Sequence, residues 1–282
     1  MNLKLKPLSE VMASAKNQPS TNMLNSSPPS TNVSLPPKSI SVNPTPSPTT
    51  DQLQVGSLAS TAAQTELSFA SQRLIGPNDR VLHIGDSHTV GIYGQEMDKH
   101  LRSTGAKVET YGSAGSSPQW WLTGQATRSG FFGKDETGKT DAPRDWKQPH
   151  ATPKLPNLMQ RFQPNVVVFS LGANLLGANA ETIEKQVKSV AEIAKANGAK
   201  IIWVGPPDGR ESKKPSSKQN ALYQALEKAA SQYGTFIDSR PLTEYPATGG
   251  DGVHYWGKEG SKTAKSWASH VFEQIQDSGS SR

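Results

Sequence analysis

The stretch Val81-Leu-His-Ile-Gly-Asp-Ser-His-Thr-Val-Gly91 decides how the chain is organised. It joins an apolar run that ends at Gly85 to a pattern typical of a helix. A serine at such a strand-to-helix turn, here Ser87, lies beside the free N–H groups of a helix N-terminus. That position suits a nucleophile, because attack on a carbonyl creates an oxyanion that needs hydrogen-bond donors. Asp86 or Ser87 could equally cap the helix, and this stretch alone leaves both interpretations open.

Strand-like runs and helical patterns alternate from about residue 66 onward. This alternation is typical of a parallel sheet covered by helices on both faces, and we therefore predict an α/β domain over residues 66–282. The expected strands are 80–84, 107–111, 165–171, 200–205 and 235–238, and the expected helices are 89–102, 180–196, 217–233 and 258–275.

Two segments depart from this alternation. Residues 1–65 are dominated by Ser, Pro, Thr, Asn and Gln, and they cannot bury enough apolar surface to offset their chain entropy, so we expect a disordered tether. Residues 123–156 are rich in Gly, Lys, Asp, Thr and Pro, with Phe131, Phe132 and Trp146 among them. Long irregular insertions are usually functional or disordered. This one could form a wall or lid over the site, or a surface excursion held by its aromatic side chains.

The cysteine content and the net charge exclude some kinds of site and of binding partner. The 282 residues include no cysteine, which excludes a disulfide framework, a thiol nucleophile and a cysteine-ligated metal. The net charge is +6, but the basic residues are scattered and no nucleic-acid-binding motif is present, so we expect no nucleic-acid partner. Attraction to an anionic polymer such as a cell-wall glycan stays possible.

The apolar runs are of strand length, so we expect no transmembrane helix. The first eight residues lack the continuous apolar core of a signal peptide. The sequence leaves the compartment open, and a periplasmic, extracellular or virion-associated location would suit a substrate in the cell envelope. The tether could attach the domain to a larger assembly.

Three further segments carry small or polar residues near the ends of expected elements. Small residues in Tyr111-Gly-Ser-Ala-Gly-Ser-Ser117 allow a ligand to approach the backbone closely. Ser170-Leu-Gly-Ala-Asn174 places an amide beyond the carboxyl end of the central strand, where ligands bind in open α/β sheets. In Asp251-Gly-Val-His254, a carboxylate and an imidazole can meet across one turn, which leaves the second ring nitrogen to face a serine.

Together, the four segments resemble the sequence blocks of the SGNH hydrolase superfamily, also called the GDSL esterases and lipases. The matching residues lie in the family's order over about residues 78–276: Gly85-Asp86-Ser87, Gly115, Gly172-x-Asn174 and Asp251-x-x-His254. Gly-Asp-Ser alone is a weak signal, whereas four blocks on the expected elements are a strong one.

The resemblance implies a three-layer α/β/α fold with a central parallel sheet, and hydrolysis of an ester without a cofactor. Ser87 would be the nucleophile, His254 the general base and then the general acid, and Asp251 the residue that orients the imidazole. The Ser87 and Gly115 amides and the Asn174 side chain would form the oxyanion hole.

The chain departs from the family pattern at two positions. His88 replaces the usual leucine after the serine, and neighbouring side chains at a helix start diverge, which argues against His88 as the base. Leu175 stands where the third block normally has an aspartate. Gly112 competes with Gly115 as the oxyanion donor. The remaining histidines show no metal-ligand spacing, so we expect no metal.

Tryptophans near the proposed blocks bear on the substrate. Trp120, Trp121 and Trp256, together with His88, are tentative substrate contacts, although the tryptophans could equally pack the core. With the polar insertion, they favour a small acyl group, acetyl, on a carbohydrate such as a bacterial cell-wall or capsular polysaccharide. The alternatives are a lysophospholipase or thioesterase of the same fold, an acyltransferase, and a non-catalytic glycan-binding or structural module.

Overall fold

The computed structural model describes residues 73–279, so the predicted tether of residues 1–65 lies outside the described residues. In this part of the chain, none of the helices combines the length and the apolar character needed to cross a membrane.

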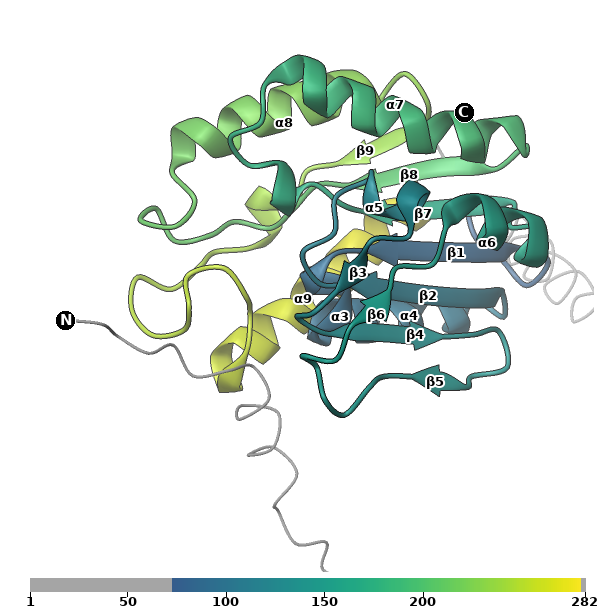
Figure 1. Ribbon diagram of the computed structural model, residues 1–282, viewed down its shortest axis with the longest axis horizontal. Coiled ribbons are helices and arrows are strands. Elements are labelled where there is room, and N and C mark those ends of the chain that lie inside the picture. The colour runs from purple at the N-terminus through teal and green to yellow at the C-terminus, as the bar shows by residue number, and fades with distance from the viewer. Residues whose placement is uncertain (1–72, 280–282) are drawn as a thin grey trace, which may run out of the picture. The chain divides into compact units, whose positions relative to one another are not determined.

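A seven-stranded sheet organises the domain, with strand order β5-β4-β2-β1-β7-β8-β9 (Figure 1). Five strands pair in parallel, as the sequence predicts: β1 (Arg80–Gly85), β2 (Lys107–Ser113), β7 (Val166–Ser170), β8 (Lys200–Val204) and β9 (Thr235–Ile237). Their carboxyl ends lie at one edge, where β1 leads into the Ser87 turn.

The insertion is more regular than expected. It adds β4 (Phe131–Lys134) antiparallel to β2, followed by β5 (Thr140–Asp141), while β3 (Ala126–Thr127) and β6 (His150–Ala151) form a separate two-stranded sheet. The main sheet is therefore mixed at one edge. Strands of two to four residues are too short to show the alternation from which strands are predicted.

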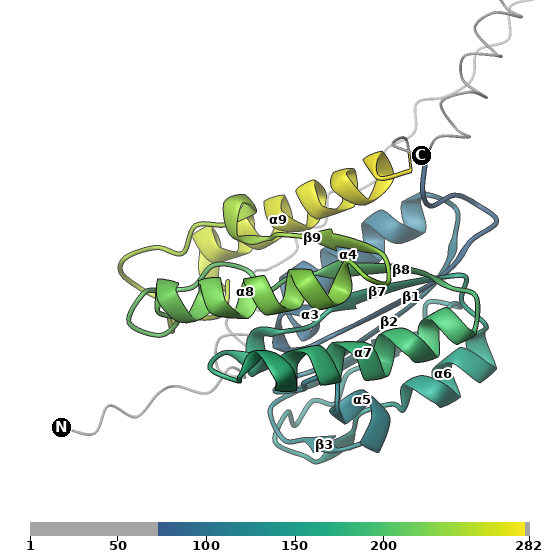
Figure 2. The same ribbon diagram turned by 90° about the horizontal axis from the view of Figure 1, so that it is seen from above.

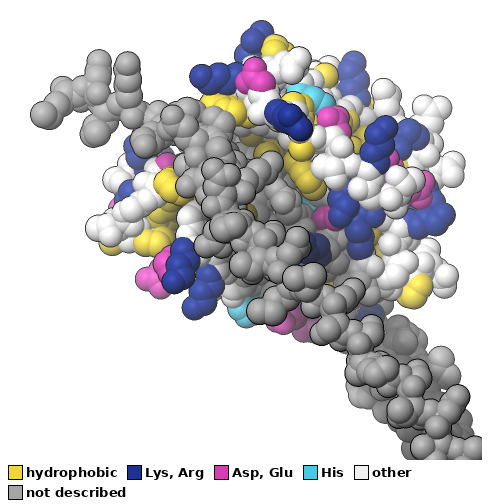
Figure 3. Space-filling view, turned by 90° about the horizontal axis from the view of Figure 1, so that it is seen from below, with side chains coloured by type: hydrophobic (Ala, Val, Ile, Leu, Met, Phe, Trp, Pro, Cys, Tyr) yellow, Lys and Arg dark blue, Asp and Glu magenta, His cyan; other side chains and the backbone are white. Residues whose placement is uncertain are grey.

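Helices cover both faces of the sheet, which confirms the α/β prediction (Figures 1 and 2). One face packs against α4 (Ile92–Ser103) and α9 (Gly257–Asp277), and the other packs against α6 (Leu155–Phe162), α7 (Ala180–Ala196) and α8 (Ser216–Ala230). The expected helix 89–102 is divided at Gly91 into α3 (Ser87–Val90) and α4. A further turn of helix, α5 (Trp120–Thr123), precedes the insertion. On the face in Figure 3, basic and acidic side chains are interspersed, as the scattered charges of the sequence suggest.

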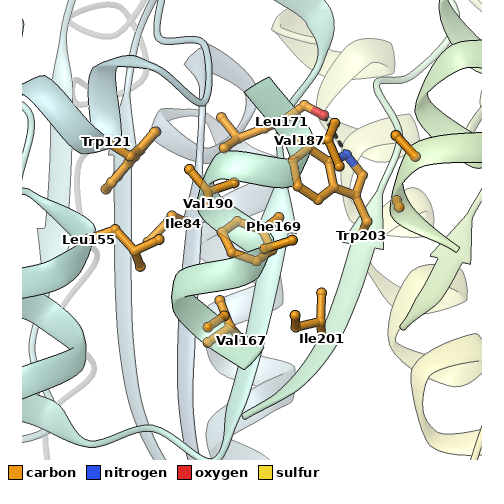
Figure 4. Close-up of a cluster of buried hydrophobic side chains, with 14 of the residues drawn as sticks. Ile84, Trp121, Leu155, Val167, Phe169, Leu171, Val187, Val190, Ile201 and Trp203 are labelled. Carbon is orange, nitrogen blue, oxygen red and sulfur yellow. Dashed lines mark hydrogen bonds between the residues drawn. The ribbon is translucent and has the colours of Figure 1, made fainter. Parts of the chain in front are cut away.

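Alternate residues of each central strand enter opposite cores. In β1, Leu82 and Ile84 pack with α6, α7 and α8, whereas Val81 packs with α4 and α9. Figure 4 shows the first of these cores, in which Phe169 stacks on Trp203. The Trp203 indole N–H donates a hydrogen bond to the Leu171 carbonyl at 3.0 Å, so the polar atom of this buried ring has a hydrogen-bond partner.

Three glycines allow the Ser87 turn to lie against its neighbours. A Cβ at Gly85 would clash with the Thr89 hydroxyl, one at Gly94 would clash with the Thr89 carbonyl, and one at Gly112 would lie 2.5 Å from the Val90 nitrogen. Because two of these contacts involve backbone atoms, side-chain rotation cannot relieve them. Close packing therefore determines where Ser87 sits.

We expect Gly85→Ala to destabilise the domain by about 1–3 kcal/mol, the usual cost of overpacking, because its Cβ would also lie 2.8 Å from the Ser170 carbonyl oxygen. Gly76→Ala is the matched control, since its Cβ would meet nothing within 4 Å, and it should change stability by less than about 0.5 kcal/mol. Urea unfolding of the two variants measures the difference. Equal midpoints would contradict the packing argument.

Candidate active site

Ser87 is the first residue of α3, and its position is set by Asp86. The Asp86 side chain caps the helix by accepting a hydrogen bond from the His88 N–H at 3.0 Å, while the Asp86 N–H donates to the Ser170 carbonyl of β7 at 3.3 Å. The turn is thus joined to the adjacent central strand. Of the two candidate caps, Asp86 therefore caps the helix, while Ser87 begins it.

The structure brings Ser87, His254 and Asp251 into one chain of hydrogen bonds. His254 Nε2 lies 3.0 Å from Ser87 Oγ, and His254 Nδ1 lies 2.7 Å from Asp251 Oδ2. Ser87 and His254 are half-buried, so the hydroxyl and the imidazole can be reached from solvent. This is the arrangement in which an imidazole can remove a proton from a serine.

Asp251 is held as a carboxylate. Its Oδ1 accepts hydrogen bonds from the backbone N–H groups of Val253 and His254, at 2.8 and 2.7 Å. Partial burial alone would raise the pKa of Asp251, but the bonds from the His254 ring and from these two amides outweigh it and lower that pKa well below its usual range. The carboxylate therefore fixes the proton on His254 Nδ1 and leaves Nε2 to face Ser87.

Tyr245 supports this turn, and the sequence analysis missed it. Its hydroxyl lies 3.1 Å from the His254 carbonyl oxygen and accepts a hydrogen bond from the Gly252 N–H at 3.0 Å. No motif surrounds Tyr245, and the loop between it and Asp251 shows no periodic pattern, so the sequence held no signal for this contact.

Three candidate oxyanion donors, the Ser87 N–H, the Gly115 N–H and the Asn174 amide, lie in the segments that follow the carboxyl ends of β1, β2 and β7. Gly115 is exposed beyond β2 with a φ of +85°, a conformation that favours glycine, in a turn closed by the bond from the Ser116 N–H to the Ser113 carbonyl at 3.1 Å. Within residues 73–279, the Ser87 and Gly115 N–H groups donate to no other protein group. The Asn174 side-chain amide donates one N–H to the Ser116 carbonyl at 2.9 Å, which leaves its second N–H available.

Gly112, the alternative oxyanion donor, is not accessible to a ligand. It is buried inside β2, where it pairs with Gly85 on one side and Phe132 on the other. A ligand cannot reach its N–H there, so the geometry favours Gly115.

Two of the four tentative substrate contacts are buried, which is a correction to the sequence analysis. Trp121 is fully buried in the core and donates its indole N–H to Ser116 Oγ at 3.2 Å. His88 is also buried, and its two ring nitrogens face protein acceptors, Asp86 Oδ1 and the Val253 carbonyl oxygen. Trp120 is half-buried beside Gly115, and Trp256 is 36% exposed.

The insertion lies against the loop that carries Gly115. Thr127 donates its hydroxyl hydrogen bond to the Ala114 carbonyl at 2.7 Å, and the Thr152 hydroxyl lies 2.7 Å from Ser113 Oγ. Both threonines are buried. The insertion therefore supports one wall of the site.

A buried lysine lies among the acidic groups near the site. Burial lowers the pKa of Lys214, and the charges of Asp86, Asp208 and Asp251 oppose that shift. In the described part of the chain, its ammonium group has no hydrogen-bond partner. Lys214 follows a second lysine in a loop, a pattern that ordinarily indicates an exposed residue.

Among residues 73–279, no three His, Asp or Glu side chains are grouped so that they could bind a metal ion.

No protein-family model matches the sequence. Protein BcsX of Komagataeibacter xylinus is 29% identical over 143 residues, which cover 47% of this chain and 52% of that protein, so the chain spans about half the length of the curated relative it matches.

Several solved structures are similar in fold. A GDSL-like lipase from Bacteroides thetaiotaomicron is 17% identical, with a TM-score of 0.44, over 76% of this chain and 97% of its own. An acetyl xylan esterase is 16% identical, with a TM-score of 0.47, over 70% and 99%. A carbohydrate esterase of family 3 from Talaromyces cellulolyticus is 15% identical, with a TM-score of 0.45, over 70% and 98%.

The lowered pKa of Asp251 predicts a pH dependence of folding. A carboxyl whose pKa is lower in the folded state than its unfolded value of about 3.9 contributes stability above that value and loses it as the pH falls. We therefore expect the stability difference between the parent and Asp251→Asn to stay constant above about pH 5 and to shrink below about pH 4. Urea unfolding from pH 7 to pH 2.5 measures it. The same difference at pH 3 and pH 7 would mean that Asp251 titrates normally.

Proposed function

We propose that this chain is a serine esterase that hydrolyses small acyl esters. The observation that carries the proposal is the hydrogen-bonded chain from Ser87 Oγ through His254 to Asp251. Three N–H donors in the segments after β1, β2 and β7 support it. Nucleophile, base and oxyanion donors are the parts that acyl transfer requires.

In the first half of the reaction, Ser87 Oγ attacks the ester carbonyl carbon while its proton passes to His254 Nε2. The carbonyl π electrons move to oxygen, and the Ser87 and Gly115 N–H groups and the Asn174 amide stabilise the oxyanion. His254 then returns the proton to the leaving alcohol as the C–O bond breaks, which leaves an acyl-Ser87. Removal of one such donor typically lowers kcat by about 10²–10³.

The second half uses the same groups. Water attacks the acyl carbon and gives its proton to His254, the bond to Ser87 Oγ breaks, and the serine recovers that proton as the acid leaves. Asp251 stays ionised throughout and stabilises the imidazolium that forms in each half-reaction. Its lowered pKa supports this role.

We further propose an acetyl group on a carbohydrate as the substrate. Long acyl chains need contiguous apolar surface, yet Trp256 is the one exposed large hydrophobic side chain among residues 73–279. Its position two residues after His254 suits contact with a sugar ring, because aromatic faces combine large contact area with low conformational entropy.

We expect Ser87→Ala to abolish hydrolysis of p-nitrophenyl acetate, with a loss on the order of 10⁶ in kcat, because the nucleophile is removed. Ser103→Ala is the matched control, since Ser103 is an exposed serine at the end of α4. The parent should also prefer acetate to butyrate and octanoate esters. Full activity in Ser87→Ala would overturn the mechanism, and a preference for octanoate would overturn the acetyl assignment.

A further inference from the structure

A pocket opens beside His254, lined by the loop before α9 and by the first turn of that helix. Its volume is about 230 Å³, and its walls include Tyr245, Thr248, Gly250, Trp256 and Glu259 as well as His254. These residues come from one continuous segment, 245–260, so the pocket is formed by the same turn that carries Asp251 and His254.

Two aromatic side chains, Tyr245 and Trp256, form part of the pocket wall, and they differ in how they are held. Tyr245 is tied to the catalytic turn through its hydroxyl, and the Arg210 guanidinium lies 5.4 Å from the centre of its ring. Arg210 also donates to the Pro246 carbonyl at 3.3 Å. Trp256 differs, because it precedes the first residue of α9 and is 36% exposed, so its ring is available to a ligand.

The polar atoms of the pocket suit hydroxyl groups. The Glu259 carboxylate accepts hydrogen bonds, the Thr248 hydroxyl both donates and accepts, and Gly249 and Gly250 expose backbone groups. The Glu259 carboxylate disfavours an anionic ligand. A volume of about 230 Å³ is below the roughly 300 Å³ at which pockets for drug-sized ligands begin, which suits one ring rather than a long chain.

The chemistry of the triad decides which part of an ester reaches this pocket. His254 must protonate the leaving alcohol, so the alcohol portion lies on the His254 side of Ser87, whereas the carbonyl oxygen lies toward Gly115 and Asn174. We propose that the pocket is a subsite for a neutral pyranose ring of that alcohol, stacked on Trp256. This inference rests on the esterase function proposed above and names its leaving group.

Kinetics on two substrates test the subsite. We expect Trp256→Ala to lose at least tenfold more kcat/KM on an acetylated neutral β-1,4-linked gluco-oligosaccharide than on p-nitrophenyl acetate, chiefly through KM, because the aryl ester has no sugar ring to stack. Trp146→Ala, a half-buried tryptophan in the insertion, is the matched control and should change neither value. Equal losses of Trp256→Ala on the two substrates would overturn the proposal.

A binding measurement separates this subsite from the esterase chemistry. Ser87→Ala protein is titrated with unacetylated hexaoses of glucose and of galacturonic acid, with isothermal titration calorimetry as the readout. We expect the neutral hexaose to bind more tightly and the added Trp256→Ala change to abolish that binding. Tighter binding of the galacturonate hexaose, or no binding of the neutral one, overturns the proposed subsite. Binding of the neutral hexaose by a parent that hydrolyses no ester would overturn the esterase and leave a glycan-binding pocket.

A different set of contacts concerns His88. Its Nδ1 lies 3.1 Å from Asp86 Oδ1, its Nε2 lies 3.2 Å from the Val253 carbonyl oxygen, and its ring centre is 5.5 Å from that of His254. Trp267 of α9 packs edge-on against the same ring. His88 therefore connects the helix that carries Ser87 to the turn that carries Asp251 and His254.

We infer that His88 is a positioning residue, whose buried ring lies between the α3 turn and the Val253 carbonyl and thereby sets the distance between His254 Nε2 and Ser87 Oγ. The charged and titratable groups that act on it are Asp86, His254 and Lys214. Leucine, the residue that the family pattern places here, would fill part of the space but could not hydrogen-bond to Val253.

The test is His88→Leu. We expect kcat to fall about tenfold on every ester with KM within twofold, because a displaced His254 removes the Ser87 proton less well while the substrate-binding surface is unchanged. His100→Leu is the control, since His100 lies in the last turn of α4 and contacts Ser269 and Phe272 of α9. A lower melting temperature with unchanged kcat would show a purely structural role and overturn the inference.

Discussion

The contact of 3.0 Å between Ser87 Oγ and His254 Nε2 joins two residues that are 167 positions apart, and much of the structure serves to maintain it. On one side, the α3 turn is pressed against β2 and α4 at glycines that leave no room for a Cβ. On the other, the turn before α9 is folded around the Asp251 carboxylate and the Tyr245 hydroxyl. Neither side tolerates much displacement, because a hydrogen bond weakens steeply with poor geometry.

Two Asp–His pairs lie next to each other at this point, and their surroundings give them different chemistry. In the Asp86–His88 pair, both residues are buried, and the second ring nitrogen faces a backbone carbonyl, which can only accept. In the Asp251–His254 pair, the second nitrogen faces a serine hydroxyl, which can give up a proton. The histidine adjacent to Ser87 in sequence is therefore unsuited to act as its base, and the distant one is suited to it.

Features formed by residues close in sequence could be predicted from the sequence. The helix 180–196 was predicted with the bounds that α7 has, because its apolar residues recur on one face, and the Asp-x-x-His spacing implied a contact within a single turn. Contacts between distant segments left no such signal. Neighbouring tryptophans, Trp120 and Trp121, look alike in sequence, yet the core encloses only the second. Tyr245 was missed for the same reason, since its partners are set by the path of a loop.

The arrangement also separates two kinds of specificity. In the proposed mechanism, the acyl carbonyl must point toward the Gly115 turn, which the insertion supports through Thr127. The leaving oxygen must come within reach of His254, which segment 245–260 surrounds. Acyl length and alcohol identity are then read by different parts of the chain, and Ser87 is the point at which the two meet. In that mechanism, changes at Thr127 would alter the choice of acyl group, while changes in 245–260 would alter the choice of alcohol.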